Sequence, residues 1–331
     1  GAPRVLYLNL DDSLGEKDPA TRHLEPVARF YDHTVSIPKR PRYKNAFCYL
    51  VGTLRAGDNV ATIDVRLYLR AQTVRALNRN RPPAQRLHFR SKCHLARQIL
   101  AEVAPLLPPD WQVYVQFDSW YASRQLIKEA RRRGWQVICG LKSNRQLNGT
   151  SLKTHAQALK HRWYTQVAVT TADGTSQTYY VRQLQGRLTQ LPAEIRVFLS
   201  KRHPRDHALA YIACTDLACS AKVALQSYTW RWSCETVNFY LKTQLGLADF
   251  RVRSVAAVDR YMVVVHLAWA YVEQRLARER SAQITTYGDI IRQHQDEHAI
   301  AWLRAAIQKA IETHDAEAVL QQFLRLPATA T

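Results

Sequence analysis

The stretch Tyr228-Thr-Trp-Arg-Trp-Ser-Cys-Glu-Thr-Val-Asn-Phe-Tyr-Leu-Lys242 arranges polar and apolar residues with the period of a helix. At about 100° per residue, four polar side chains fall within one narrow arc, and these are Tyr228, Arg231, Glu235 and Lys242. An apolar set falls on roughly the opposite side, namely Trp230, Cys234, Val237 and Leu241. The spacing therefore predicts a single helix over residues 228–242. One face would be buried, and the other would aim a phenol, a guanidinium, a carboxylate and an ammonium at one place.

The polar face of this helix has an ordinary interpretation, in which it is simply solvated. Arg231 and Glu235 would then form an i,i+4 pair that stabilises the helix by only about 0.3–0.5 kcal/mol. Two aspartates favour a functional interpretation instead, because Asp12 and Asp118 each end an apolar, strand-like stretch. Each aspartate taken alone is more often a cap or turn residue. Adjacent strand ends would bring the two carboxylates together, with Glu235 joining them from the helix.

Three carboxylates in one place predict a cation site. They cannot all stay ionised without a cation, and hard oxygen ligands of this kind suit Mg²⁺, with Mn²⁺ as a substitute. Two ions about 3.5–4 Å apart would activate the attacking oxygen and stabilise the leaving oxygen in phosphoryl transfer. We therefore expect the residues that bind the metal and carry the catalysis to be Asp12, Asp118 and Glu235.

Composition and charge indicate a folded protein with a polyanionic partner. The chain has 331 residues, 47% of them hydrophobic, and a formal net charge of +20, which excludes a disordered basic tail. Its longest apolar run, residues 261–272, is too short to span a bilayer and is predicted to form a buried helix. Six scattered cysteines suit reduced thiols in a cytosol. Four basic clusters would together form a track for DNA: residues 39–44, 131–133, 201–203 and 251–253.

The order of elements predicts a mixed α/β protein. A strand over residues 5–12 is followed by a hairpin of strands near 46–54 and 60–69, and Pro82-Pro83 then interrupt the chain. Next comes a helical stretch marked by apolar residues near helical spacing, namely Leu87, Leu95, Ile99 and Val103. A strand over 113–118, a helix to Arg133 and a strand over 135–141 complete this part. Residues from about 162 to 214 are β-rich, and the remainder is helical.

These motifs together resemble a bacterial insertion-sequence transposase of the DDE superfamily. The branch in question is defined by the signature Tyr-x2-Arg-x3-Glu-x6-Lys, which residues 228–242 meet with every spacing intact. Leu10-Asp-Asp-Ser13 resembles the first motif of the family, in which the catalytic aspartate directly precedes Thr or Ser, and this favours Asp12 over Asp11. Phe117-Asp-Ser-Trp-Tyr121 resembles the second motif and supplies Asp118. The likeness covers about residues 4–280.

The resemblance implies an RNase H-like fold, a mixed sheet flanked by helices. A β-rich insertion would precede the last catalytic helix, and a helical region would end the chain. We expect the catalytic domain to comprise residues 1–145 and 223–280, with the insertion at 146–222 and the C-terminal region at 281–331. Members of this branch usually begin with a separate DNA-binding segment, and whether such a segment is missing from this chain stays open from the sequence.

The resemblance also implies an activity, which is Mg²⁺-dependent cut-and-paste transposition. The protein would nick DNA at the inverted repeats that end the element, and the freed 3′-OH would attack target DNA. Tyr228, Arg231 and Lys242 would hold the phosphate backbone. Trp163 is a candidate for stacking on a flipped base, although a core role is the more common one for such a residue. The expected partner is double-stranded DNA, bound by a homodimer in the bacterial cytoplasm at the nucleoid, with no membrane involved.

Two other functions remain open from the sequence. A DNA-binding protein descended from a transposase would keep the positive charge without needing the carboxylates. Another RNase H-like nuclease, acting on RNA–DNA hybrids or branched DNA, would need the carboxylates but not the signature residues Tyr228, Arg231 and Lys242.

Overall fold

The structure is a computed structural model that describes residues 4–32, 35–37, 39–159, 163–171, 174–191 and 193–324. The chain divides into two compact units, residues 1–269 and residues 270–331. Every element of the candidate site lies in the first unit. The domain boundaries expected from the sequence stay a prediction.

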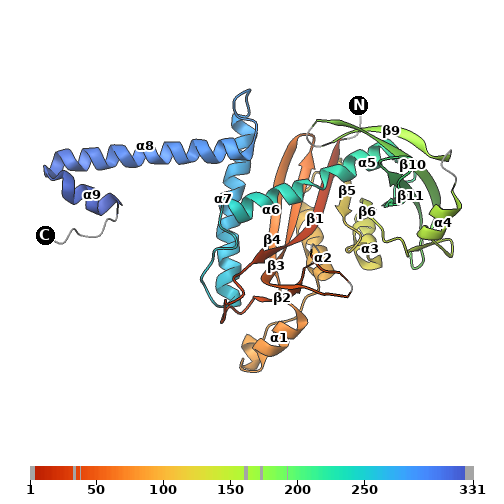
Figure 1. The fold of residues 1–331 in the computed structure, drawn as a ribbon, viewed down its shortest axis with the longest axis horizontal. Coiled ribbons are helices and arrows are strands. Elements are labelled where there is room, and N and C mark those ends of the chain that lie inside the picture. The colour runs from red at the N-terminus through yellow and green to blue at the C-terminus, as the bar shows by residue number, and fades with distance from the viewer. Residues whose placement is uncertain are drawn as a thin grey trace. The chain divides into compact units, whose positions relative to one another are not determined.

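The first unit is built on one mixed sheet (Figure 1). At its centre β1 (Val5–Glu16) pairs antiparallel with β3 (Tyr43–Ala56) and parallel with β5 (Gln112–Phe117), which is followed by parallel β6 (Gln136–Gly140). The hairpin partner of β3 is β4 (Asn59–Tyr68), and β2 (Ala28–Tyr31) also pairs with β3. A three-stranded antiparallel meander followed by two parallel strands is the RNase H-like arrangement, so the expected fold class is confirmed.

Alternate residues of β1 face two different helical layers. Leu6, Leu8 and Leu10 are buried in a cluster with α2 (Lys92–Val103) and α3 (Arg124–Arg132). Tyr7, on the other face, is buried in a second cluster with α5 (Ala221–Trp230). Because side chains alternate along a strand, each residue of β1 is assigned to one layer by its position alone.

The β-rich insertion continues the same sheet instead of forming a separate one. It begins with β7 (Gln146–Leu147), β8 (Thr150–Ser151) and α4 (Leu152–Ala158). Four longer strands follow, β9 (Thr165–Thr170), β10 (Ser176–Arg187), β11 (Glu194–Lys201) and β12 (Ala210–Cys214). β12 pairs antiparallel with β6, so the strands run in the order β6-β12-β11-β10-β9 to the edge of the sheet. The insertion is therefore joined to the sheet that carries the aspartates.

Helix boundaries follow capping residues. Ser123 accepts a hydrogen bond from the backbone N–H of Leu126 and starts α3, and Gly134, with φ of +75°, lies just beyond its end. Ser91 starts α2 in the same way, by accepting from the N–H of His94. The sequence pattern had placed Leu87 on this helix, which is wrong: Leu87 precedes the cap and belongs to the loop after α1 (Ala71–Asn78).

The expected single helix over residues 228–242 is also corrected. α5 ends at Trp230 and α6 (Ser233–Thr243) begins after a two-residue break at Arg231 and Trp232. Before the break, the hydroxyls of Ser227 and Thr229 donate to backbone carbonyls three residues earlier. Side-chain bonds of this kind compete with the backbone ladder and bend helices. The signature residues therefore come from two helices and from the bend between them.

The last helices are α7 (Val255–Glu279), α8 (Tyr287–Thr313) and α9 (Ala316–Leu324). Within the described residues, α7 is the one helix that is long and apolar enough to cross a membrane, judged by length and composition only, and one such helix is weak evidence. Its residues Met262 and Trp269 are buried, and the indole N–H of Trp269 donates to Thr62 Oγ1 at 2.8 Å. Val264 and Leu267 are exposed, so the predicted buried helix is buried on one side only.

Candidate active site

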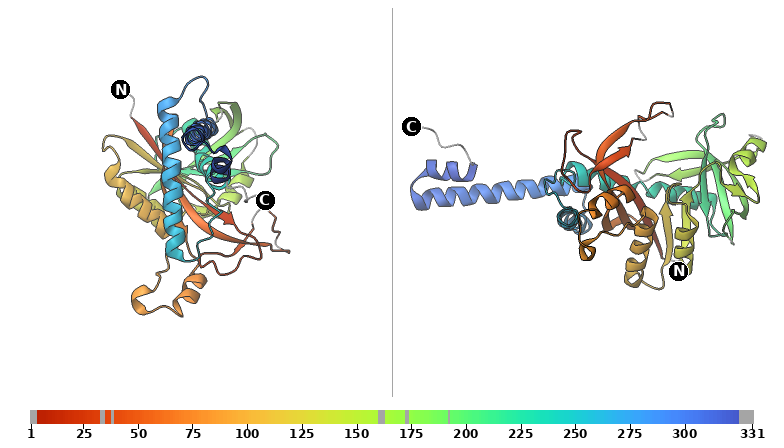
Figure 2. Two further views of the ribbon diagram at one scale, coloured as in Figure 1. Left: turned by 90° about the vertical axis from the view of Figure 1, so that its left-hand side faces the viewer. Right: turned by 90° about the horizontal axis from the view of Figure 1, so that it is seen from below.

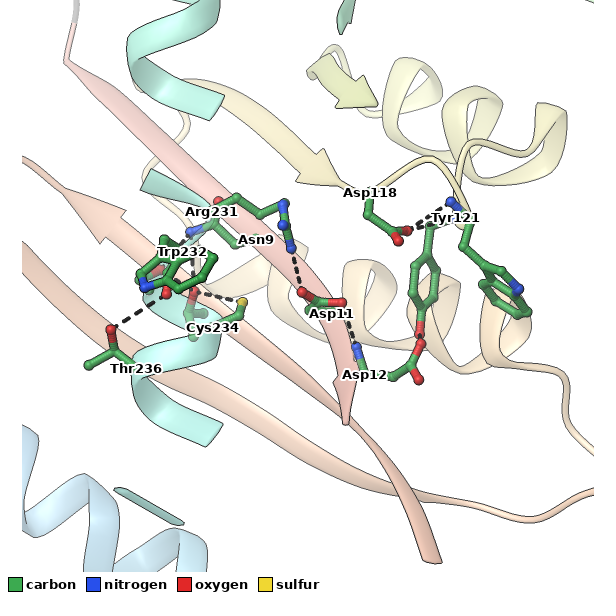
Figure 3. A network of polar contacts seen from close by, with 12 residues as sticks. Asn9, Asp11, Asp12, Asp118, Tyr121, Arg231, Trp232, Cys234 and Thr236 are labelled. Carbon is green, nitrogen blue, oxygen red and sulfur yellow. Dashed lines mark hydrogen bonds and ion pairs between the residues drawn. The ribbon is translucent and has the colours of Figure 1, made fainter. Parts of the chain in front are cut away.

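Asp11 lies at the centre of the polar face of β1 (Figure 3). Its carboxylate forms an ion pair with the guanidinium of Arg231, and both side chains are largely buried. One strand position earlier on the same face, the Asn9 amide donates to Ser233 Oγ at 3.2 Å, and one position later Ser13 Oγ accepts from Lys242 Nζ at 2.7 Å. The three contacts hold the bend and α6 against β1.

Two further carboxylates act on Asp11 through space. Burial raises the pKa of Asp11 to about 6, the charge of Arg231 opposes that rise, and the negative charges of Glu235 and Asp118 add to it. Glu235 stands in the first turn of α6, where the helix dipole favours a carboxylate. The electrostatic neighbours of Asp11 are therefore two of the three acids that the sequence singled out.

Asp12 points to the opposite face of the sheet. It accepts hydrogen bonds from the Lys92 ammonium at 2.5 Å and from the Tyr121 hydroxyl at 2.8 Å, and Cys48 Sγ lies 3.6 Å away. Asp12 follows Leu6, Leu8 and Leu10 on the same side of β1. Its partners therefore lie on the face of the sheet that α2 and α3 cover. The choice of Asp12 over Asp11 stays a prediction, and the structure places Asp11, on the other face of β1, among the electrostatic neighbours of Glu235.

Asp118 follows directly after β5, next to β1. Its Oδ1 accepts from the backbone N–H groups of Trp120 at 2.9 Å and of Tyr121 at 3.2 Å, so it does close the turn after the strand. Tyr121 thereby joins Asp118, through its N–H, to Asp12, through its hydroxyl. This turn fixes the position of Asp118, whose second oxygen accepts no hydrogen bond within the described residues.

Tyr228 lies between Arg231 and the end of β6. The Arg231 guanidinium stands 5.7 Å from the centre of its ring. A Cβ atom at Gly140 would come within 2.7 Å of the Tyr228 hydroxyl and 3.0 Å of the backbone nitrogen of Ser119, so this close approach needs glycine at the end of β6. Tyr228 and Arg231 are thus brought to the turn that carries Asp118.

Lys242 lies at the far end of α6, where burial lowers its pKa and the charge of Glu235 counteracts that effect. The residues that the structure brings to one face are therefore Asp11, Asp118, Tyr228, Arg231, Glu235 and Lys242. Trp163 is 39% exposed in the insertion, and no contact links it to this group within the described residues. Its role on a flipped base stays a prediction.

The donor set suits a hard divalent cation in its chemistry. Asp11, Asp118 and Glu235 offer carboxylate oxygens from a strand, a strand end and a helix start, and each of the last two disfavours ionisation of the first. Within the described ranges, no three His, Cys, Asp or Glu side chains already stand close enough to hold a metal ion. The Arg231 guanidinium supplies the positive charge beside Asp11 in this arrangement.

The sequence motif favours Asp12 over Asp11, and no role was predicted for Lys92 and Tyr121, the two residues that hold Asp12. The alternation of β1 carries a signal for Asp11, because Tyr7, Asn9, Asp11 and Ser13 form one face and Leu6, Leu8, Leu10 and Asp12 the other. Which of the two faces meets the signature helices is not written in that pattern.

Comparison with known proteins gives one family. The model of the transposase DDE domain family matches residues 90–271, more than half of the chain. The match includes Asp118 and the whole signature from Tyr228 to Lys242, and it begins after β1. A comparison with curated proteins gives no match. With its RNase H-like sheet and its signature on that sheet's polar face, the chain belongs to the transposase DDE domain family.

Proposed function

We propose that the chain is the catalytic core of a cut-and-paste DNA transposase, with Asp11, Asp118 and Glu235 as its catalytic carboxylates. The observation that carries the proposal is the polar face of β1. There Asp11 meets the electrostatic influence of the other two acids and the guanidinium of the signature arginine. The reaction is strand nicking at the ends of the element, followed by transfer of the 3′-OH into target DNA.

The chain's own residues have distinct tasks in this reaction. Asp11, Asp118 and Glu235 would hold Mg²⁺, or Mn²⁺ in its place. When bound, two such ions supply the positive charge that favours the attacking and leaving oxygens in phosphoryl transfer. Arg231, Tyr228 and Lys242 hold the phosphate backbone beside the carboxylates. Arg231 exchanges its contact with Asp11 for the phosphate, and the Lys242 ammonium is kept in place by Ser13 until DNA arrives.

The proposed partners are the inverted repeats of the element and the target DNA. A net charge of +20 suits a polyanion of this kind. We propose that the protein acts at the nucleoid in the bacterial cytoplasm and pairs into a homodimer on DNA. Exposed apolar side chains on α8, among them Leu303 and Ile307, support the pairing.

The test compares two neighbouring aspartates. Asp11→Asn, Asp118→Asn and Glu235→Gln are expected to slow nicking of end-containing DNA at least about 10³-fold, which corresponds to about 4 kcal/mol of transition-state stabilisation. Titration calorimetry with Mn²⁺ should show weaker metal binding by the same three proteins. Asp12→Asn is the matched control, and it should keep its metal affinity.

The outcomes separate the alternatives. If the wild-type chain binds end-containing DNA without nicking it, and the three variants bind it equally well, the protein acts only by binding DNA. If Asp12→Asn loses Mn²⁺ binding while Asp11→Asn keeps it, Asp12 is the first carboxylate, as the sequence motif suggested. Cleavage of RNA–DNA hybrids in preference to element ends would identify a different RNase H-like nuclease.

A further inference from the structure

A basic projection leads into the start of α2 and has no role in the proposed chemistry. It comprises residues 70–91, which we call the arginine arm: α1, the loop after it with a short 3-10 helix (Pro83–Gln85), and the return to α2. The arm contains six arginines and one histidine but no aspartate or glutamate. Figures 1 and 2 show α1 extending away from the sheet beyond β2 and α2.

Four of these arginines are exposed and have no carboxylate partner within the described residues: Arg75, Arg79, Arg86 and Arg90. Arg75 lies on α1 and Arg79 caps its C-terminal end one helical turn later, so about 6 Å separates their Cβ atoms. Phosphates along one DNA strand rise by about 3.4 Å each, so both guanidinium groups can reach the same strand.

The arm is pre-ordered, which distinguishes it from an ordinary charged loop. The Asn78 amide donates to the Leu87 carbonyl and its oxygen accepts from the Leu87 N–H, both at 2.8 Å, so the side chain closes the loop between them. Arg81 binds both oxygens of Glu25, at 2.8 and 2.7 Å, and ties the arm to the body. An ordered surface loses less conformational entropy on binding than a flexible one.

The same glutamate brings a second basic segment to the arm. Glu25 accepts from the Val255 N–H at 2.7 Å, and its own N–H donates to the Arg253 carbonyl at 2.9 Å. The exposed side chains of Arg251 and Arg253 therefore belong to the same surface. A groove of about 430 Å³ lies between the arm and the start of α7, and among its lining residues are Arg86, His88, Arg90 and, as its one carboxylate, Asp259.

We propose that the arginine arm is a binding site for the phosphate backbone of duplex DNA that runs on from the catalytic carboxylates. The arm ends at Ser91, and Lys92, the next residue, bonds to Asp12, which follows Asp11 on β1 but faces the other side of the sheet. In the proposal, the duplex runs from the cleaved phosphate at the carboxylates past the start of α2 and onto the arm. The inference rests on the proposed function for the nature of its ligand, and the duplex concerned is either the element end or the target.

The experiment measures salt-dependent binding by the full chain in EDTA, so that strand cleavage plays no part. A variant with four substitutions, R75Q, R79Q, R86Q and R90Q, is compared with a matched control of four exposed arginines elsewhere, R187Q, R278Q, R280Q and R304Q. Each phosphate contact adds about 0.9 to the slope of log K against log salt. The magnitude of the slope should therefore fall by about 3–4 in the arm variant. It should fall by less in the control. Unchanged thermal unfolding of both proteins shows that the fold is retained.

Three labelled probes identify the ligand. One duplex carries the DNA that flanks the coding region, a second duplex is its scrambled version, and the third probe is single-stranded RNA of the same length. If the arm variant has an equally reduced slope on both duplexes, the arm binds DNA of any sequence, as a target site requires. If the slope is reduced on the first duplex alone, the arm binds the element end. A slope equal to that of the control on both duplexes, or a loss confined to RNA, would overturn the proposal. The proposed function is tested separately, by nicking in the Asp11→Asn variant.

Discussion

Asp12 and Lys92 form an enclosed ion pair on the face of the sheet that α2 and α3 cover, with side-chain exposures of 18% and 16%. We expect Asp12→Asn to lower the free energy of unfolding by about 3 kcal/mol, because the Lys92 ammonium would be left without its counter-charge. Lys92→Met should have a similar cost. Urea unfolding measures both changes, and Asp58→Asn, at a pair whose carboxylate is 89% exposed, is the control with an expected change below about 0.5 kcal/mol.

The double variant Asp12→Asn/Lys92→Met decides whether the pair is the cause. Removing both partners should cost clearly less than the sum of the single substitutions, because no unpaired charge remains. Strict additivity would mean that the two residues act separately and that the ion pair is not what holds them. The same comparison bears on the assignment of Asp11, since a structural Asp12 is expected to affect stability more than metal affinity.

Individual residues also show which parts of the candidate site can be predicted from the sequence and which cannot. Asp118 at a strand end and Glu235 on a helix were both predictable, because each follows from local periodicity. The choice between Asp11 and Asp12 depends on which face of β1 meets α6, and that is set by contacts over 200 residues away along the chain, such as Ser13 with Lys242. Local pattern alone cannot supply such a contact.

At the scale of elements, the helix period explains which signature residues lie near one another. It does not explain that they come from two helices with a break between them. The 3.6-residue period predicted a continuous helix, whereas hydroxyl groups at Ser227 and Thr229 bond to the backbone and the helix bends before Arg231. The bend frees Arg231 to reach Asp11. The central strands, the hairpin and the caps were predictable because turn and cap residues mark them, while the joining of β12 to β6 needed long-range pairing.

Glu25 joins three elements, namely the arginine arm, the loop before α7 and α7 itself, so its ionisation should stabilise them together. Burial opposes its charge, but the N–H of Val255 and the guanidinium of Arg81 outweigh that and hold the pKa of Glu25 below its usual value. A lowered pKa gives stability that is present above the unfolded value of about 4.3 and lost as the pH falls through the folded pKa.

We therefore expect Glu25→Gln to be less stable than the wild type by about 1 kcal/mol at pH 7. The two stabilities should converge in acid, because the wild-type side chain is then neutral as well. Urea unfolding across a pH series measures the difference, with Glu102→Gln, at a more exposed ion pair, as the control. A gap that stays constant into acid would show that Glu25 acts through its shape and not through its charge.

At the scale of the whole molecule, the unit of residues 270–331 presents a long helix with little of its surface buried. In α8, Ile290 is the one buried residue within the described part of the helix. Four apolar residues spaced three or four apart are exposed along one side: Ile300, Leu303, Ile307 and Ile311. Helices in water owe most of their stability to packing of such a face, so a partner for it is expected.

A second copy of the chain is the partner that the proposed DNA-bound homodimer requires. We expect the double variant Leu303→Glu/Ile307→Glu to bind an end-containing duplex as a single protomer, because two carboxylates placed in a paired apolar stripe would have to be buried without counter-charges. Mass photometry of the DNA complex measures this directly. Ala301→Glu/Ala305→Glu, which adds the same charge to the other side of the helix, should leave the paired complex intact. If both variants remain dimeric on DNA, protomers pair through another surface, and the stripe on α8 has a different partner.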